Sequence, residues 1–311
     1  MDAIAVFPPI PPELRQTLVR SFQLVEFGKG PLPPALRVAV ITSVGGADAA
    51  LMDLMPNLGL IACNGTGLER VDLPEAARRG IVVRNTPDEV TDDTADFALG
   101  LIYATARRLA EADRFVRAGR WSKERLTPSR RVFGGHIGIV GLGRIGLKIA
   151  ERASGAGMTV SYTGPRRKAD KPYSFVADIR QLAAAVDVLV LSCPGGTETY
   201  HLINSEVLRA LGPDGFLINV SRGDVVDEEA LIDALNHKII GGAGLDVFAR
   251  EPNIDERFFG FENVVLAPHY ASVTNATRQA IADTLHDAIA AFLSGKPVLD
   301  AAAAYRTQTA I

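Results

Sequence analysis

The sequence predicts an α/β fold built on doubly wound parallel sheets, and three features of the chain favour it. From residue 135 onward, short runs rich in Val, Ile and Leu alternate with segments of helical length. These runs are apolar on both faces, as are the strands of a parallel sheet that helices cover on each side. A glycine-rich turn follows the first of these runs, and the first part of the chain repeats the alternation more weakly. The 311 residues are enough for two domains of this kind.

Strands are predicted wherever a short apolar run stands between turn residues. In the second, more regular part of the chain we expect six strands, over residues 137–140, 158–163, 187–192, 216–220, 243–247 and 264–267. In the first part we expect four strands, over residues 4–7, 38–41, 60–63 and 81–84. The spacing of the six strands by helix-length crossovers predicts a doubly wound domain for the second part.

Helices are expected between and beyond these strands. Residues 73–79 are predicted to form a short helix, and residues 277–293 an amphipathic one. Residues 91–119 are predicted to be one long helical stretch, with Thr91 and Asp92 as candidate caps. Its apolar side chains cover more than one face, which is typical of a helix in a core or at an interface.

Charge and cysteine content exclude several classes of protein. Acidic residues number 36 against 33 basic ones, so no electrostatic attraction to nucleic acid or to an anionic membrane is expected. The two cysteines, Cys63 and Cys193, lie far apart and lack the spacing of a metal site, so we expect neither a disulfide nor a bound metal. The N-terminus has an acid and several prolines where a signal peptide needs basic and apolar residues. We therefore expect a protein of the cytoplasm.

A dinucleotide-binding motif follows the strand predicted over residues 137–140. It reads Gly141-Leu142-Gly143-Arg144-Ile145-Gly146 and precedes a helical pattern. The first glycine permits a tight turn, the second lets the backbone approach a pyrophosphate, and the third allows close helix–strand packing. The N-terminus of the following helix supplies N–H donors for the same group. The alternative is a glycine-rich turn with a purely structural role.

The residues after the next strand predict which dinucleotide binds. An acid about twenty residues beyond the glycines would bind the ribose 2′-hydroxyl of NAD(H). Here the strand ends in Gly164-Pro165-Arg166-Arg167-Lys168, and no acid occurs before Asp170. Arginine recognises phosphate through bidentate hydrogen bonds. We therefore predict that NADP(H) is preferred and that NAD(H) is possible; the alternative is a solvated basic loop.

Three polar residues follow later strands, at the sheet edge where α/β proteins bind ligands. Arg222, Glu251 and His269 follow the strands at 216–220, 243–247 and 264–267. Reduction of a 2-oxo acid needs a cation for the carboxylate, a proton donor at the carbonyl and a hydride source. Arg222 and His269 fit the first two needs, and Glu251 fits the task of orienting the imidazole and keeping it protonated. The alternatives are a surface arginine, a loop carboxylate and a structural histidine.

Four segments in this order resemble the D-isomer-specific 2-hydroxyacid dehydrogenase family: VGLGRIG, INVSRGDVVDEEAL, GAGLDVFAREP and NVVLAPH. The resemblance extends over about residues 62–299. Within the family, the paired arginines, NTPDEVTDDTADFAL and CPGGTETYHLIN are similar to the NADPH-dependent glyoxylate/hydroxypyruvate reductase branch. This resemblance implies that the protein reduces a small 2-oxo acid, glyoxylate or hydroxypyruvate, to the D-2-hydroxy acid.

The resemblance also implies roles for individual residues. Arg222 would bind the substrate carboxylate and carbonyl, and His269 would be the general acid and base, its pKa raised by Glu251. Backbone N–H groups of Asn64, Gly65, Thr66 and Gly67 would bind the substrate carboxylate from the first domain. On the cofactor side, Asp246 would hydrogen-bond the nicotinamide carboxamide, and Val220 would lie near the nicotinamide. The adenosine and pyrophosphate would lie along Cys193, Pro194 and Thr199.

The family's architecture implies two Rossmann or flavodoxin-like domains with the active site in the interdomain cleft. The substrate-binding domain would be discontinuous, over residues 1–93 and 283–311, and the dinucleotide-binding domain would cover residues 94–282. The apolar surface of the helix near residues 92–118 is hard to bury within one domain, so we also expect a homodimer.

Two residues depart from the family pattern, Glu69 in local hydrogen bonding and Tyr270 in substrate choice, and two other functions stay open. Glu69 stands where the family often has Asp, and Tyr270 follows His269 where a small aliphatic residue is common. A hydroxyphenylpyruvate or 2-ketogluconate reductase would share every catalytic residue and differ only in the pocket lining. A dinucleotide-sensing protein, like the transcriptional corepressors that share this scaffold, would bind the cofactor without turnover.

Overall fold

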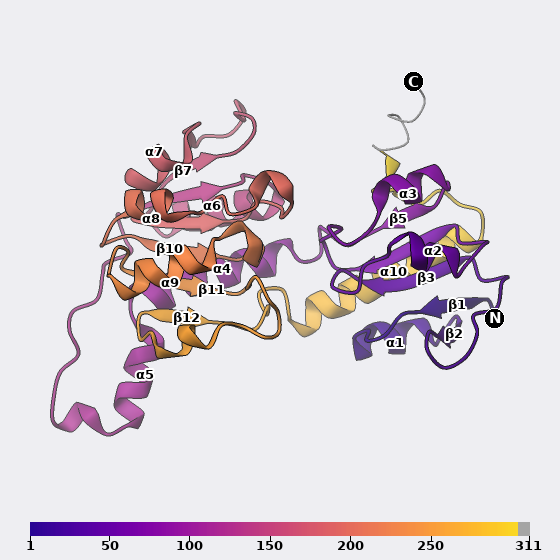
Figure 1. Cartoon of the computed structure of the whole chain (residues 1–311), viewed down its shortest axis with the longest axis horizontal. Helices are drawn as coiled ribbons and strands as arrows, with labels where there is room; N and C mark the ends of the chain where they lie inside the picture. The colour runs from indigo at the N-terminus through magenta and orange to yellow at the C-terminus, as the bar shows by residue number, and fades with distance from the viewer. Residues whose placement is uncertain (304–311) are drawn as a thin grey trace. The chain divides into compact units, whose positions relative to one another are not determined.

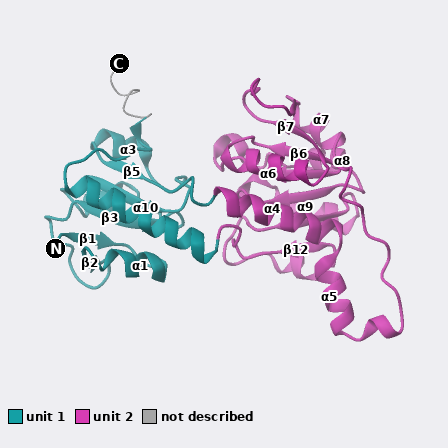
Figure 2. Ribbon diagram, turned by 180° about the vertical axis from the view of Figure 1, so that it is seen from behind, with its two compact units in different colours: residues 1–90, 273–311 teal, residues 91–272 magenta. Residues whose placement is uncertain are grey.

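The computed structural model describes residues 1–303 of the chain (Figure 1). It consists of two compact α/β units, which Figure 2 distinguishes by colour: Met1–Val90 with Val273–Ile311, and Thr91–Ser272. The assignment of residues 1–93 and 283–311 to substrate binding, and of 94–282 to dinucleotide binding, stays a prediction about what each part does. Residues 304–311 of that assignment lie outside the described residues.

The first unit contains a five-stranded parallel sheet in the order β2-β1-β3-β4-β5. Its strands are β1 (Ala3–Val6), β2 (Gln23–Glu26), β3 (Val38–Thr42), β4 (Leu60–Asn64) and β5 (Val82–Arg84). Alternate strand residues face opposite sides, so that Ile4 packs in one core cluster and Ala5 in the other. Two helices cover each side: α1 (Pro12–Leu18) and α10 (Asn275–Leu293) on one, α2 (Ala49–Asp53) and α3 (Leu73–Arg78) on the other.

The second unit contains a seven-stranded parallel sheet in the order β12-β11-β10-β9-β6-β7-β8. Its strands are β6 (His136–Val140), β7 (Thr159–Thr163), β8 (Ser174–Phe175), β9 (Val188–Leu191), β10 (Phe216–Asn219), β11 (Gly242–Leu245) and β12 (Val264–Leu266). The strand order reverses between β6 and β9. Ligands of open α/β sheets bind outside the carboxyl ends of the strands at such a switch point.

Helices cover both faces of this sheet, which is why its strands are apolar on both sides. On one face lie α4 (Thr91–Ala106) and α6 (Arg144–Gly155), which pack against each other. On the other face lie α7 (Ile179–Ala184), α8 (Ser205–Leu211) and α9 (Glu228–Asn236). No helix within residues 1–303 is long and apolar enough to cross a membrane.

The ten predicted strands all form, with ends that differ by one or two residues. Two short strands, β2 and β8, were not predicted. β2 pairs only with β1 at the sheet edge, has polar residues at both ends and is only partly buried. β8 has two residues. Neither carries the apolar run from which strands are recognised in a sequence.

The prediction of a single helix over residues 91–119 was wrong. The segment forms α4 and a separate helix, α5 (Leu109–Arg117), because Arg108 adopts a left-handed conformation with φ of 53°. The break allows Arg108 to donate two hydrogen bonds to Glu111, whose carboxylate is buried, and it buries Phe115 as well. Helix α4 begins at Thr91, so Asp92 lies in its first turn.

Candidate active site

The glycine motif forms the turn between β6 and α6, at the switch point of the second sheet. Gly141 has a φ of +91°, and a Cβ there would lie 2.7 Å from the Cα of Cys193. A Cβ on Gly146 would lie 2.1 Å from the carbonyl oxygen of Gly141. A Cβ on Gly143, in contrast, would meet no atom of the chain within 4 Å. Packing therefore requires the outer two glycines, whereas Gly143 borders open space, as the predicted approach of a pyrophosphate would need.

Three hydroxyl groups hold the segments around this turn, and two of them, Ser192 and Ser221, were given no role in the sequence analysis. Ser192 donates to the carbonyl oxygen of Gly141 at 2.8 Å, and Ser221 donates to that of Cys193 at 2.5 Å. Thr199 donates to the carbonyl oxygen of Pro194 at 2.8 Å. These contacts place the predicted adenosine-side residues beside the glycine turn. The two serines could not be recognised in the sequence, because a serine after a strand is common in any loop.

Cys193 contributes its backbone rather than its thiol to this arrangement. Its side chain is buried, and burial raises the pKa of the thiol despite a hydrogen bond with Ser221. The thiol is therefore protonated at neutral pH and unreactive. Val220, predicted to lie near the nicotinamide, is also buried, directly before Ser221.

The basic segment after β7 is exposed. Gly164 is followed by Arg166 and Arg167, both at the surface, and neither arginine has a hydrogen-bond or ion-pair partner within residues 1–303. Two guanidinium groups without a described partner, just after β7, are suited to binding a phosphate.

His269 and Glu251 form a hydrogen-bonded pair at the carboxyl ends of β12 and β11. His269 Nδ1 lies 2.8 Å from Glu251 Oε2, and Glu251 Oε1 accepts the backbone N–H of Phe248 at 2.9 Å. Because an ionised carboxylate only accepts hydrogen bonds, Nδ1 carries a proton in this pair. The other ring nitrogen, Nε2, has no hydrogen-bond partner within residues 1–303, and 45% of the histidine side chain is exposed.

The pair shifts both pKa values. The hydrogen bond with Glu251 raises the pKa of His269 above its usual value, and this outweighs the opposing effect of burial. For Glu251 burial raises the pKa, but the hydrogen bonds from His269 and Phe248 outweigh it, so the net pKa is lowered. An ionised glutamate beside a protonated imidazole is the state that a general acid needs.

Asp246 holds the loop that carries His269. Its carboxylate, 1% exposed, accepts the backbone N–H groups of Tyr270 at 2.6 Å and Ala271 at 3.0 Å. Its own carbonyl oxygen accepts the N–H of His269 at 2.8 Å. Three hydrogen bonds thus fix a residue whose φ of 53° is unfavourable for histidine. The predicted contact of Asp246 with a carboxamide stays a prediction; the partners that the structure gives it are the backbone groups of residues 269–271.

Arg222 lies beside this pair. It follows β10, and its Nη1 donates to the carbonyl oxygen of Ser221 at 2.7 Å. A Cβ on the next residue, Gly223, would lie 1.8 Å from the backbone carbon of Phe248, so the segments that carry Arg222 and Glu251 touch backbone to backbone. The charge of Arg222 lowers the pKa of both Glu251 and His269. The structure therefore brings the three predicted catalytic residues together.

The predicted substrate loop, Asn64 to Gly67, lies at the end of β4 in the first unit. Gly65 has a φ of +124°, and a Cβ there would lie 2.7 Å from Ser43 Oγ, so glycine is required. The buried Thr86, which was not predicted, accepts the N–H of Gly65 at 3.2 Å. Asn85 donates to the carbonyl oxygen of Thr66 at 2.8 Å. The loop is therefore fixed, and the N–H of Gly65 already has a partner.

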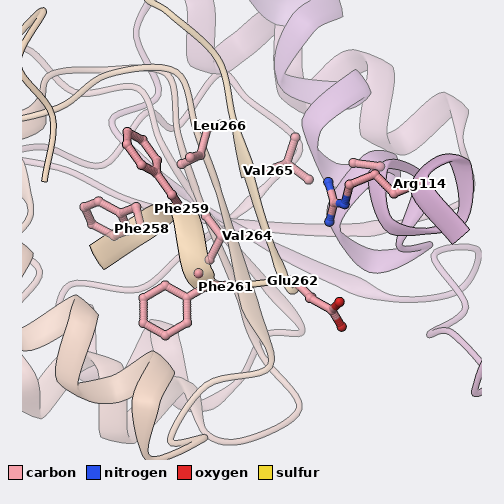
Figure 3. A pocket seen from close by; sticks show the side chains of 10 residues that line it. Arg114, Phe258, Phe259, Phe261, Glu262, Val264, Val265 and Leu266 are labelled. Carbon is pink, nitrogen blue, oxygen red and sulfur yellow. The ribbon is translucent and has the colours of Figure 1, made fainter. Parts of the chain in front are cut away.

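A cavity of about 480 Å³ lies elsewhere in the second unit, between α5 and the segment that leads into β12. Figure 3 shows Phe258, Phe259 and Phe261 on one side of it and Arg114 of α5 on the other. It contains none of the predicted site residues. Within residues 1–303, no group of three or more His, Cys, Asp or Glu side chains is placed to hold a metal ion.

Comparison with known proteins agrees with the geometry. A family model described as "D-isomer specific 2-hydroxyacid dehydrogenase, NAD binding domain" matches residues 99–271. The chain is 43% identical to hydroxyphenylpyruvate reductase of Plectranthus scutellarioides, over 96% of this chain and 99% of that protein. It is 40% identical to glyoxylate/hydroxypyruvate reductase A of Arabidopsis thaliana, with the same two shares covered.

A solved structure is similar over nearly the whole chain as well. It is an NADPH-dependent glyoxylate/hydroxypyruvate reductase from Sinorhizobium meliloti in complex with NADP and malonate. The TM-score is 0.89 at 38% sequence identity, over 96% of each chain. The protein therefore belongs to the D-isomer-specific 2-hydroxyacid dehydrogenase family, as an oxidoreductase with a dinucleotide-binding Rossmann domain that reduces 2-oxo acids to 2-hydroxy acids.

Proposed function

We propose that this enzyme reduces glyoxylate or hydroxypyruvate to the D-2-hydroxy acid and prefers NADPH over NADH. The observation that carries the proposal is the hydrogen-bonded pair of His269 and Glu251 beside Arg222, at the carboxyl ends of the dinucleotide-binding sheet. A dinucleotide sensor has no need of a proton donor whose pKa is raised in this way.

The catalytic residues divide the reaction between them. His269 gives a proton from Nε2 to the carbonyl oxygen of the substrate, while its Nδ1–H stays bonded to Glu251. Glu251 stabilises the imidazolium before the transfer and orients the ring. Arg222 binds the substrate carboxylate and polarises the carbonyl group. The hydride for the carbonyl carbon would come from the nicotinamide of a bound NADPH.

The cofactor is assigned to the turn between β6 and α6. Gly143 and the N-terminus of α6, with Arg144 and Ile145 in its first turn, would hold the pyrophosphate. Leu142, Cys193, Pro194 and Thr199 would contact the rest of the dinucleotide with Val220. Arg166 and Arg167, which follow Gly164, would bind the 2′-phosphate that distinguishes NADPH from NADH.

The first unit is assigned to the substrate. The fixed loop of Asn64, Gly65, Thr66 and Gly67 would bind the carboxylate through its backbone, with Gly65 contributing least because Thr86 occupies its N–H. The cytoplasm is the proposed location, because both cysteines are free and buried and form no disulfide.

A second substrate class has a specific observation in its favour. Tyr270 follows His269 directly, is 50% exposed, and packs edge-on against Phe97 of α4 at 6.4 Å between ring centroids. An aromatic ring beside the proton donor offers a surface on which an aromatic 2-oxo acid could stack. Hydroxyphenylpyruvate is therefore the alternative substrate, and its reductase is among the relatives.

Initial rates of NADPH and NADH oxidation test the proposal. The substrates are glyoxylate, hydroxypyruvate, hydroxyphenylpyruvate, 2-ketogluconate and pyruvate. Fast NADPH-linked turnover of the first two supports it. Faster turnover of hydroxyphenylpyruvate would transfer the assignment to the aromatic substrate. Binding of NADPH without turnover of any of the five would contradict an enzymatic role on these acids.

The proposed oligomer is a homodimer. Because residues 91–119 form two helices rather than one, the apolar surface that supports the dimer lies on a different segment than expected. The exposed apolar side chains now belong to α5 and the turn after it: Leu109, Val116 and Trp121, which is 61% exposed. Light scattering should give twice the chain mass of 33.2 kDa, and replacing Val116 and Trp121 by Asp and Ala should halve it. A wild-type mass of one chain would contradict the proposal.

Replacing His269 by Ala removes the proton donor. General acid catalysis contributes roughly 100- to 10,000-fold, so kcat should fall by at least about 100-fold. The dissociation constant for NADPH should stay within about twofold, because the proton is delivered to the substrate. The control is His237→Ala, since that histidine is exposed and its side chain bonds to Asp233 of α9 and to no other described residue. A kcat for His269→Ala within tenfold of wild type would refute the role.

The pH dependence of reduction should follow the pKa of His269. Because Glu251 raises this pKa, the acid form persists to higher pH, and the rate falls only as the pH passes the raised value. Glu251→Gln removes the negative charge, so the fall should move to lower pH, and the rise in the rate of alcohol oxidation should move with it. The control is Glu229→Gln at an exposed carboxylate. An unmoved pH profile in the Glu251 variant would show that the pair does not set the titration.

Replacing Arg166 and Arg167 by Ala should change cofactor selectivity. Each charged hydrogen bond to the 2′-phosphate contributes roughly 1.5–3 kcal/mol, so the dissociation constant for NADPH should rise at least about tenfold. NADH lacks this phosphate, and its dissociation constant should stay nearly constant. The matched control is Arg180→Ala, an exposed arginine of α7 paired with Asp178. Equal losses for both cofactors would mean that the arginines do not bind the 2′-phosphate.

A further inference from the structure

The three consecutive cations after β7 differ in what they contact. Arg166 and Arg167 are exposed and have no polar partner within residues 1–303. Lys168 reaches back to the glycine turn, where its Nζ donates to the carbonyl oxygen of Leu142 at 2.5 Å. In the sequence the three residues form one basic cluster, but in the structure the side chain of Lys168 contacts the glycine turn and those of Arg166 and Arg167 do not.

A buried tyrosine fixes the backbone of Lys168. Tyr162 of β7 is 1% exposed and lies in the core cluster between the sheet and α4 and α6. Its hydroxyl accepts the N–H of Lys168 at 2.7 Å and donates to the carbonyl oxygen of Lys168 at 3.4 Å. The ring also packs on Phe175 of β8 at 5.4 Å. The backbone position of Lys168 is therefore fixed by a residue of the hydrophobic core.

The acceptor of Lys168 is part of the peptide unit between Leu142 and Gly143. The side chain of Leu142 is buried, so this peptide is held from the core side as well. A trans peptide is planar, with its N–H pointing opposite to its C=O. Drawing the carbonyl oxygen of Leu142 toward Lys168 therefore turns the N–H of Gly143 the other way. That N–H has no hydrogen-bond partner within residues 1–303.

We propose that Lys168 is a positioning residue for the dinucleotide: through Leu142 it orients the N–H of Gly143 toward the pyrophosphate. This inference rests on the cofactor site of the proposed function. The pyrophosphate is common to NADPH and NADH, so Lys168 sets the affinity for both, whereas Arg166 and Arg167 set the choice between them. The competing role is that Lys168 binds the 2′-phosphate as a third cation.

The dissociation constants of NADPH and NADH, measured by nucleotide fluorescence with the full chain, separate these roles. Lys168→Met keeps the length of the apolar stem and removes the ammonium group. It should raise both dissociation constants by the same factor, about tenfold for one charged hydrogen bond. The double variant of Arg166 and Arg167 is the comparator, because it should raise only the NADPH value.

Tyr162→Phe provides a second route to the same effect. It removes the hydroxyl that holds the backbone of Lys168, and the ring still fills the core. It should weaken both cofactors in parallel, and combining it with Lys168→Met should cost less than the product of the two factors, because both act through one contact. Thermal unfolding of each variant checks that the second unit is folded.

Two outcomes would overturn the inference. A loss confined to NADPH in Lys168→Met would make the lysine a phosphate ligand. Unchanged dissociation constants for both cofactors would mean that the bond to Leu142 does not position the turn. Either result would contradict the role of Lys168 alone, because the proposed function is tested separately by turnover of 2-oxo acids with the wild-type enzyme. If the wild-type chain binds neither dinucleotide, the proposed function fails together with this inference.

Discussion

The hydrogen bond between His269 and Glu251 is the contact on which the geometry of the active site depends. It joins two loops that leave neighbouring parallel strands, β12 and β11, and such strands deliver their loops to the same edge of the sheet. This hydrogen bond keeps its geometry only if the backbone of each of the two loops is fixed. Asp246 fixes one by three hydrogen bonds, and the close contact of Gly223 with Phe248 fixes the other and brings Arg222 beside it. The proposed proton donor, His269, is therefore preorganised by backbone contacts, which keep it in place without a ligand.

Most of the fold, and the residues proposed for catalysis, could be read from the sequence because their signals are local. A buried parallel strand needs an apolar run, and each predicted run became a strand. The glycine turn is readable for a steric reason: no side chain fits at Gly146, where a Cβ would lie 2.1 Å from a backbone oxygen. Arg222, Glu251 and His269 were recognisable because each is a chemically distinctive residue directly after a strand, where the topology brings ligands together.

The parts that were not predictable depend on partners distant in the sequence or on rare backbone conformations. Nothing in the sequence around Arg108 marks a helix end, since no glycine or proline is present; the left-handed turn is stabilised by the buried carboxylate of Glu111 and by the burial of Phe115. The task of Asp246 depends on residues more than twenty positions away, as the sequence spacing of Tyr270 and Ala271 shows. Lys168 follows two arginines, and only the fold reveals that its ammonium group returns to the glycine turn.

The sheet topology keeps the residues proposed for proton transfer apart from those proposed to select the cofactor. The residues proposed for catalysis lie at the ends of β10, β11 and β12, whereas the residues proposed to bind the 2′-phosphate follow β7, on the other side of the strand-order reversal. The polar side chains that hold the catalytic loops, Asn219, Ser221 and Asp246, are all buried and bond to nearby backbone. None of these bonds involves the exposed Arg166 or Arg167. On the proposed assignments, replacing Arg166 and Arg167 therefore alters which dinucleotide binds while the proposed proton donor, His269, keeps its position. The contact of Lys168 with the glycine turn is a separate one, and in this proposal it supports the binding of either dinucleotide.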